Sequence, residues 1–184
     1  TDLAVAGGIN LNLIIPEIES IDRDLYDIAS TDGHTRSFSS DADGCGMGDG
    51  AGIVLLKRLD DALRDKNNIY AVICSSGSNS CGGASATPGM PDGSAQSALI
   101  IKNIGAADIP AEKIRFAECH ASATPIGDSI EARALSEALV AFTDKKRYCA
   151  VTSIKSNFGH LNMASGIAGF IKAVVALYNN TIYP

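Results

Sequence analysis

Residues 148–178, YCAVTSIKSNFGHLNMASGIAGFIKAVVALY, hold the pattern that decides the fold class of this chain. The apolar stretch Tyr148 to Ile154 predicts a buried strand, because a short apolar run between polar segments is typical of one. A polar turn follows and ends at Gly159-His160. Residues 162–178 are nearly all apolar or small, which predicts a helix buried on most of its sides. A buried strand that leads into a buried helix is typical of α/β layered domains.

Strands and helices alternate through the rest of the chain as well. Apolar runs predict strands within residues 1–15, 44–56, 69–74 and 113–118. Helical patterns cover residues 59–66, 94–106 and 128–142, and a short helix is expected within residues 17–33. Residues 75–93 are rich in Ser, Gly and Pro and predict a long loop, which at this length favours a functional role. The sequence therefore predicts an α/β fold.

Glycine occupies every second position from Gly44 to Gly52. In a strand this spacing places all these glycines on one face, because successive side chains point to opposite sides. A face without side chains lets another backbone or a ligand come close. The run contains neither G-x-G-x-x-G nor G-x-x-x-x-G-K-[ST], so a nucleotide-binding loop is not indicated. We expect close packing against this segment.

Composition and charge exclude several classes of function. The 184 residues suffice for one domain, and the formal net charge of -6 argues against nucleic acid as a partner, since phosphate binding needs clustered Lys and Arg. The five cysteines include no C-x-x-C pair, which argues against a metal site and a disulfide framework. A reducing, cytoplasmic location is expected. No apolar run reaches membrane-spanning length, so no membrane partner is expected.

Two of the three histidines follow predicted strands, at the edge where α/β sheets carry functional groups. His120 follows the strand at 113–118, and His160 follows the strand at 148–154. Two imidazoles there can donate hydrogen bonds to a carbonyl oxygen on which negative charge develops. The alternative, that each ring only satisfies polar groups or caps a turn, is less favoured for two histidines in this setting. His34 lies in a polar loop and is expected to have no such role.

The other candidate residues leave alternatives open. Lys155 lies just beyond a predicted strand, and a partly buried cation that orients its neighbours is as consistent with this position as a surface lysine. Asp128 and Glu131 begin a predicted helix and are interpreted as structural, because negative charge stabilises a helix N-terminus. No cysteine has an evident base beside it, so an inert small residue is favoured for each one. These cysteines are at positions 45, 74, 81, 119 and 149.

Five stretches of the chain resemble the β-ketoacyl synthases, most closely those of type I polyketide synthases. They are residues 38–61, 69–73, 118–131, 153–160 and 164–177, in the family's order. The stretch ECHASATPIGDSIE at 118–131 is similar to the motif H-G-T-G-T-x-x-G-D-P-x-E, and SIKSNFGH at 153–160 is similar to K-S-N-x-G-H. The resemblance implies a thiolase-like fold layered α-β-α-β-α, of which this chain is an incomplete part. Residues 1–70 would be the end of the N-terminal half of a ketosynthase, and residues 71–184 most of its C-terminal half.

The two motifs imply functional residues and partners. His120 and His160 match the two catalytic histidines of the family, and Lys155 matches the lysine that supports them. Ser122 and Thr124 match the hydroxyl positions that contact the phosphopantetheine arm. That arm is carried by an acyl-carrier protein, the partner implied, so no directly bound cofactor is expected. A homodimer is implied too. No cysteine of this chain matches the family's nucleophile, which is therefore expected outside the chain, in a missing N-terminal segment.

The function implied is decarboxylative Claisen condensation of an acyl thioester with a malonyl-type extender, in polyketide or fatty acid biosynthesis. The alternative is a non-elongating ketosynthase-like domain that acts as a decarboxylase, a carrier-protein-binding domain or a dimer scaffold. Retention of both histidines and Lys155 favours condensation. Ala121 and Ala123 replace glycines of the first motif, and their methyl groups are candidates to narrow the pantetheine channel.

Overall fold

The computed structural model describes residues 2–11, 28–80 and 90–183 of the chain. The strands are β1 (Leu3–Asn10), β2 (Gly50–Lys57), β3 (Phe116–Glu118) and β4 (Ala150–Thr152). The helices are α2 (Leu59–Arg64), α3 (Gly93–Ala107), α4 (Pro125–Val140), α5 (Lys155–Phe158) and α6 (Ser165–Tyr178). Two single 3₁₀ turns, η1 (Ala111–Lys113) and η2 (Asn162–Ala164), precede β3 and α6.

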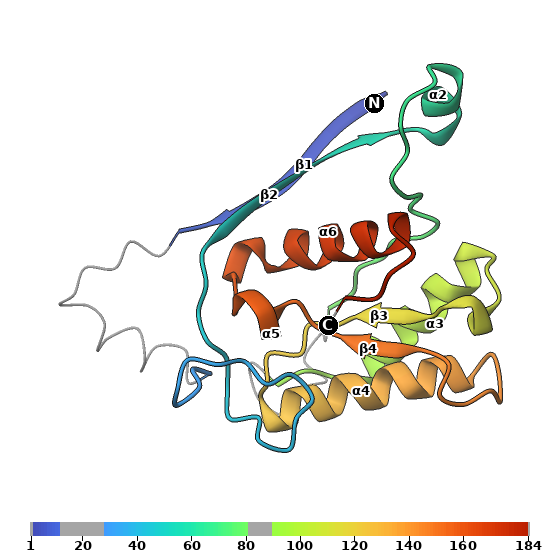
Figure 1. Ribbon diagram of the computed structural model, residues 1–184. Coiled ribbons are helices and arrows are strands. Elements are labelled where there is room, and N and C mark those ends of the chain that lie inside the picture. The colour runs from blue at the N-terminus through green and yellow to red at the C-terminus, as the bar shows by residue number, and fades with distance from the viewer. Residues whose placement is uncertain (1, 12–27, 81–89, 184) are drawn as a thin grey trace.

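Helix α6 is the central element of the fold. Figure 1 shows it between the ribbon formed by β1 and β2 and the pair formed by β3 and β4, while α4 lies beyond that pair. α6 contacts β1, β2 and β3, and α3 packs against α4. Strand and helix layers therefore alternate, which confirms the α/β class and the layered arrangement expected from the sequence.

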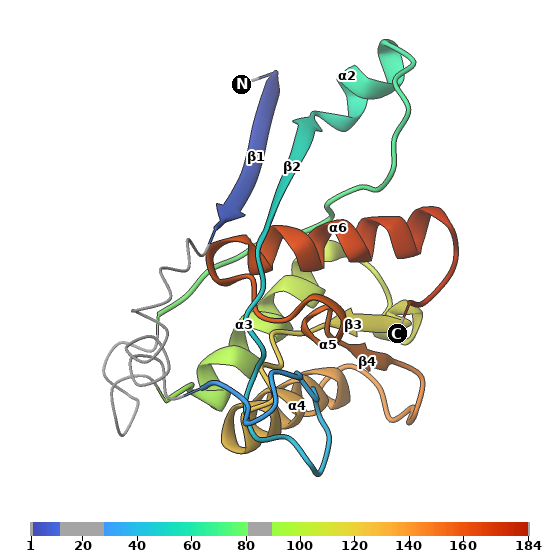
Figure 2. The same ribbon diagram turned by 60° about the vertical axis from the view of Figure 1, so that its left-hand side comes forward.

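The pairing of the strands determines which loops meet. β1 and β2 are antiparallel, and β3 and β4 are parallel, with Glu118 opposite Thr152 in the last pair. Parallel neighbours end at the same edge, so the segments that follow Glu118 and Thr152 leave the sheet side by side. Figure 2 shows α5 next to the ends of these two strands. The fold thus brings the two histidine motifs together at one edge.

The glycine run packs closely against other parts of the chain. A Cβ atom on Gly52 would lie 3.0 Å from side chains of α6, and one on Gly48 would overlap the carbonyl oxygen of Phe158. The N–H of His160 donates to the carbonyl of Gly46 at 2.7 Å, and the N–H of Gly48 donates to the carbonyl of His160 at 3.1 Å. The predicted close approach is confirmed, and it fixes the backbone of His160.

Two predicted strands differ from the structure. A strand beginning at Gly44 is wrong, because Gly44 has φ +131° and only isolated bridges form at Cys45 and Met47 before β2 begins. The strand predicted at 69–74 is also wrong, since this segment pairs with no strand of the described residues. Backbone N–H and C=O groups of a strand need a neighbour to bond. The described part of the chain places none beside this segment.

The remaining predicted elements are present, several with shorter bounds. The helices predicted at 59–66, 94–106 and 128–142 correspond to α2, α3 and α4, and the strands at 113–118 and 148–154 shorten to β3 and β4. The polar turn before His160 contains the short helix α5, which was not predicted. α6 has the predicted position, although Leu177 and Tyr178 at its end are exposed. Residues 12–27, where most of a short helix was expected, and 81–89 lie outside the described residues.

Two kinds of feature are absent from residues 2–11, 28–80 and 90–183. No helix in these ranges combines the length and apolar character needed to cross a membrane. No group of three or more His, Cys, Asp or Glu side chains gathers there as a metal ion would require.

Candidate active site

The rings of His120 and His160 face each other where β3 and β4 end. Their centroids are 5.5 Å apart and their planes are inclined by 77°, so the edge of one ring points at the other. His120 lies two residues beyond β3, and His160 lies two residues beyond α5. The two histidines that the sequence singled out therefore converge, while His34 stays in an exposed loop.

Lys155 joins the histidine pair from the first position of α5. It is 4% exposed, and its Nζ donates to the carbonyl oxygen of His120 at 2.5 Å. The hydroxyl of Ser153 donates to the same carbonyl at 3.3 Å. Burial lowers the pKa of Lys155, while the carboxylates of Glu131 and Glu118 raise it. Of the two interpretations of Lys155, the structure supports the buried lysine that orients its neighbours.

The hydrogen bonds of His160 determine which ring nitrogen carries the proton. Its Nδ1 accepts the backbone N–H of Asn162 at 2.9 Å and lies 3.1 Å from the hydroxyl oxygen of Ser165. A nitrogen that accepts carries no proton, so in the neutral ring Nε2 holds the N–H and can donate it. Burial lowers the pKa of His160 to about 4, and the charges of Lys155 and His120 act in the same direction. Near neutral pH, His160 is an uncharged donor.

The environment of His120 also favours the neutral ring. Removal from water lowers the pKa of His120, and the ammonium of Lys155 lowers it further. The carboxylates of Glu131 and Asp128 raise it. The residue keeps an exposed surface, so a ligand can reach it.

The loop after His120 carries the two hydroxyls predicted to contact pantetheine. Ser122 is 7% exposed, and its Oγ lies 3.5 Å from the Oγ1 of Thr124. Thr124 is half-buried and occupies the residue before α4. The two hydroxyls are therefore neighbours close to the histidines, and their contact with pantetheine stays a prediction.

Ala121 and Ala123 adopt backbone conformations that suit glycine. Their φ angles are +31° and +59°, and a left-handed conformation costs an L-residue roughly 1–2 kcal/mol. The residues are 1% and 0% exposed, so their methyl groups are covered by the chain itself. Whether these methyl groups narrow the pantetheine channel stays a prediction.

Glu131 and Asp128 do more than stabilise the start of α4. The carboxylate of Glu131 accepts the backbone N–H of His120 at 2.7 Å and that of Ala121 at 2.8 Å. Asp128 is 5% exposed and accepts the backbone N–H of Phe38 at 2.8 Å. Their interpretation as helix-terminal charges missed these contacts. The acidic residue that ends the first motif was the signal available in the sequence.

The loop at 28–46 supports the segment that follows His120. The hydroxyl of Ser37 donates to the carbonyl of Ala121 at 2.7 Å, and the N–H of Gly44 donates to the carbonyl of Ala123 at 2.9 Å. With the bond from Phe38 to Asp128, this loop contacts both the 121–123 segment and α4. A segment far away in the sequence therefore helps to hold the backbone beside His120.

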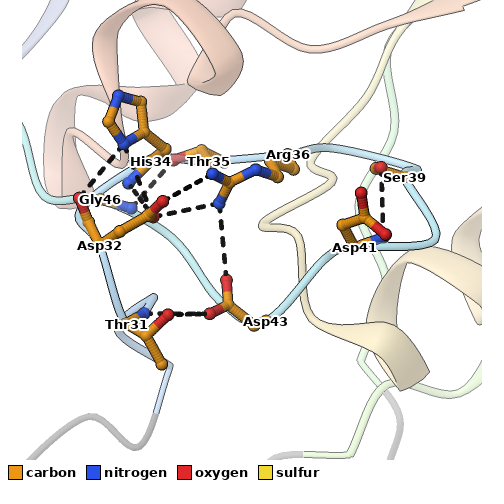
Figure 3. Close-up of polar contacts among 9 residues, drawn as sticks. All are labelled: Thr31, Asp32, His34, Thr35, Arg36, Ser39, Asp41, Asp43 and Gly46. Carbon is orange, nitrogen blue, oxygen red and sulfur yellow. Dashed lines mark hydrogen bonds and ion pairs between the residues drawn. The ribbon is translucent and has the colours of Figure 1, made fainter.

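Side chains within the same loop tie it together. Arg36 forms a two-pronged ion pair with Asp32, with N···O distances of 3.0 and 2.6 Å (Figure 3). Asp43 accepts both the N–H and the hydroxyl of Thr31, at 3.1 and 2.6 Å. The Arg36 guanidinium holds the pKa of Asp32 well below its usual range. His34 bonds only locally here, to Asp32.

Three of the four described cysteines, Cys45, Cys119 and Cys149, are poorly suited to act as nucleophiles, whereas Cys74 is exposed. Burial raises the pKa of Cys119 to about 12, and neighbouring carboxylates add to this effect. Burial also raises the pKa of Cys45 and Cys149. A raised pKa keeps the thiol protonated, and the thiol attacks far more slowly than the thiolate. Cys81 lies outside the described residues.

Two family models match nearly the whole chain. Residues 1–62 match "Beta-ketoacyl synthase, N-terminal domain", and residues 70–184 match "Beta-ketoacyl synthase, C-terminal domain". The chain belongs to the β-ketoacyl synthase family. The resemblance drawn from the two histidine motifs is therefore confirmed.

Relatives of this ketosynthase chain are polyketide synthases. It is 41% identical over 184 residues to a phenolphthiocerol/phthiocerol polyketide synthase of Mycobacterium tuberculosis, covering 99% of the chain and 8% of that protein. It is 39% identical over 183 residues to the highly reducing polyketide synthase cla2 of Cladosporium cladosporioides, covering 100% of the chain and 8% of that protein. The chain thus spans a small part of these relatives and corresponds to a ketosynthase portion of them.

Solved ketosynthases have the same fold. The ketosynthase from module 6 of the bacillaene synthase of Bacillus subtilis 168 matches with a TM-score of 0.91 and 36% identity, covering 100% of this chain and 32% of that one. The ketosynthase from module 1 of the bacillaene synthase of Bacillus amyloliquefaciens FZB42 matches with a TM-score of 0.87 and 38% identity, covering 98% and 31%. The thiolase-like fold is confirmed, and this chain spans about a third of each ketosynthase.

Proposed function

We propose that this chain supplies the decarboxylating part of a ketosynthase that performs decarboxylative Claisen condensation in polyketide assembly. The observation that supports it most is the meeting of His120, His160 and Lys155 at the ends of β3 and β4. Membership of a family of condensing enzymes gives this arrangement its chemical meaning.

Decarboxylation is the step in which the two histidines act. A malonyl thioester, carried on the phosphopantetheine of an acyl-carrier protein, loses carbon dioxide when the bond between C2 and its carboxylate breaks. The electron pair moves toward the thioester carbonyl, so negative charge develops on that oxygen. His160 donates from Nε2 to this oxygen, and His120 supplies the second donor. Preorganised donors in a site of this kind lower the barrier because they need not reorient.

Lys155 and Glu131 keep His120 in place during this step. Lys155 bonds the carbonyl of His120, and Glu131 bonds its N–H, so both backbone groups of His120 are held by side chains. In catalysis, Lys155 is proposed to hold the histidine pair in place and, through its positive charge, to keep both rings neutral. Holding donors in a fixed geometry accounts for much of the rate enhancement available to an enzyme.

Carbon–carbon bond formation follows from the enolate. Its carbon attacks the carbonyl of an acyl group held as a thioester, the new bond forms, and the cysteine thiolate leaves. We place the cysteine outside this chain, because none of its five cysteines matches the family's nucleophile. Burial also disfavours the thiolates of Cys45, Cys119 and Cys149. Ser122 and Thr124 are proposed to bind the pantetheine arm. The partners proposed are the acyl-carrier protein and a second ketosynthase copy in a homodimer.

The second candidate is a non-elongating ketosynthase that decarboxylates without condensing. It needs the same histidines and Lys155, so the geometry described above supports it equally. The two candidates differ only in whether a nucleophilic cysteine accepts an acyl chain.

Acyl loading of the full-length protein distinguishes the two candidates. The protein is incubated with a radiolabelled acyl thioester, digested and mapped by mass spectrometry, and a malonyl-carrier protein is then added to look for a condensed product. Condensation predicts label on a cysteine outside residues 1–184 and a β-ketoacyl product. Carbon dioxide release without label or product would support the decarboxylase. Label on a cysteine of this chain would contradict the proposed division of the site.

A further inference from the structure

A buried ion pair lies next to the histidine site. Glu118 is the last residue of β3, and Lys172 comes from α6; their side chains are 9% and 7% exposed, and Oε2 lies 3.1 Å from Nζ. Desolvating two charges is costly, and a buried pair repays this cost only with good geometry and further hydrogen bonds. Among the described residues, Lys172 Nζ makes only the ion pair, and the further hydrogen bonds are those of Glu118. The contacts of Glu118 show what this pair holds together.

Glu118 links the two strands that lead to the site. Its Oε2 accepts the hydroxyl of Thr152 at 2.7 Å, and its Oε1 accepts the backbone N–H of Ile154 at 2.5 Å. The backbone ladder between β3 and β4 ends with the N–H of Cys119 donating to the carbonyl of Thr152 at 2.8 Å. Beyond that point, the Glu118 carboxylate bonds the residue that precedes Lys155. One side chain therefore continues the connection between the two motifs past the end of the sheet.

Helix α6 is fitted to this carboxylate. A Cβ atom on Gly169 would lie 3.2 Å from the Cγ of Glu118, so a small residue here lets the helix come close. Lys172, one turn further along, reaches the carboxylate. At the start of the same helix, Ser165 lies 3.1 Å from the Nδ1 of His160. α6 thus contacts Glu118 at one point and His160 at another.

Glu118 also shares a pocket with part of the candidate site. It lines a pocket together with His120, Lys155 and Ser165. Its carboxylate acts electrostatically on Lys155. A change of charge at Glu118 is therefore felt at the ammonium that bonds the His120 carbonyl.

We propose that the Glu118–Lys172 ion pair positions His120 and Lys155 for decarboxylation, as a pair of residues that act through the site without touching substrate. The proposal rests on the proposed function for the identity of the step. It goes beyond that function because neither residue belongs to the two histidines, the lysine or the pantetheine positions.

The first measurement is independent of activity. Diethyl pyrocarbonate reacts with neutral imidazole rings, and mass spectrometry of peptides from the full-length protein gives the rate at each histidine. In Glu118→Gln and Lys172→Met, the segment around His120 loses its support, so we expect its reaction to accelerate by about threefold or more. His34, in its exposed loop, is the internal reference and should react at the same rate in all proteins.

The second measurement is carbon dioxide release from a malonyl-carrier protein. Misplacing a donor can cost on the order of 100-fold in rate, so kcat should fall by roughly 10- to 100-fold in each single variant while KM stays nearly constant. The double variant Glu118→Gln/Lys172→Met should lose no more than the worse single variant, because the two residues act as a unit. Arg133→Met is the matched control: it removes a cation from an exposed pair with Glu137 on α4 and should leave kcat unchanged.

The outcomes separate this proposal from the proposed function. Unchanged His120 labelling and unchanged kcat in both single variants would overturn the positioning role, while wild-type activity would leave the proposed function intact. A wild-type protein that releases no carbon dioxide would contradict the proposed function. The rate of His120 labelling would then be the only test of the positioning role. If a single variant does not fold, two other variants allow the same comparison of His120 labelling and kcat with the wild type. The double variant leaves no unpaired charge, and Lys172→Arg keeps the cation.

Discussion

At the scale of single residues, burial sets the charge of the site. Removal from water lowers the pKa of His120, His160 and Lys155, and the Nδ1 bond of His160 places its proton on Nε2. The histidine pair could be predicted from its place after two strands. For Lys155, residue spacing left a buried and a surface position open, and only the family resemblance implied its supporting role, because burial depends on tertiary packing. The contact of Glu131 with His120 was missed for the same reason: it depends on a turn between strand and helix.

The lowered pKa of His160 predicts a loss of stability in acid. The folded protein holds this pKa at about 4, below the ordinary 6.5, so as the pH falls the unfolded chain takes up the proton first. Stability should therefore be fully present above pH 6.5 and decrease between pH 6.5 and 4. After allowance for solvent screening of a half-buried ring, His160 should contribute roughly 1–2 kcal/mol to this decrease in the free energy of unfolding.

Urea unfolding of the full-length protein at a series of pH values measures this effect. His160→Asn keeps an acceptor for the Asn162 N–H and removes the titration, so the fall in stability between pH 6.5 and 4 should be smaller in this variant. The pKa of His120 is also lowered, so its titration accounts for part of the decrease in stability that remains in the variant. An equal fall in wild type and variant would show that His160 does not titrate as described.

Glu131→Gln tests the carboxylate that accepts two backbone N–H groups. The amide keeps one acceptor oxygen and points an N–H₂ group at the other donor, so one of the two backbone N–H groups loses its partner. We expect the free energy of unfolding to fall by about 1–3 kcal/mol. Glu137→Gln, in an exposed pair on the same helix, should change it by roughly 0.5 kcal/mol or less. Equal effects of the two substitutions in denaturant titrations would argue against the contact.

At the scale of elements, helices were easier to predict than strands. The periodic patterns of α3, α4 and α6 are local, so the sequence alone determines their approximate bounds. A strand also needs a partner, and the segment at 69–74 is apolar enough for a strand yet has no described neighbour. The prediction made from the glycine run is confirmed in part. Its face without side chains packs closely as predicted, although the strand begins only at Gly50. Its first half instead bonds the backbone around His160.

Two glycine-to-alanine substitutions should have opposite effects. In Gly48→Ala the new methyl group would overlap the Phe158 carbonyl, so the free energy of unfolding should fall by about 1–3 kcal/mol. Gly105 lies in α3, where a Cβ atom would have no neighbour within 4 Å, and Gly105→Ala should raise stability by about 1 kcal/mol. Thermal unfolding of both variants checks the pair, and a tolerated Gly48→Ala would contradict the close approach.

At the scale of the whole molecule, the described residues leave apolar surface uncovered. Large apolar side chains on the outer face of β2 are exposed, Ile53 at 73% and Leu55 at 66%. These values accord with a chain that spans about a third of the ketosynthases it matches. The α/β layered class was predictable from local patterns, whereas the thiolase-like α-β-α-β-α order was expected only from the family resemblance.

The central claim is that His120 and His160 together drive decarboxylation, and carbon dioxide release tests it most directly. The full-length protein is supplied with a malonyl-carrier protein labelled in the free carboxylate, and wild type is compared with His120→Ala, His160→Ala and the control His34→Ala. We predict that each of the first two variants loses roughly 10²–10³-fold in rate, as expected for loss of an oxyanion donor, and that the control retains its activity. Unchanged release of carbon dioxide in both His120→Ala and His160→Ala would contradict the account.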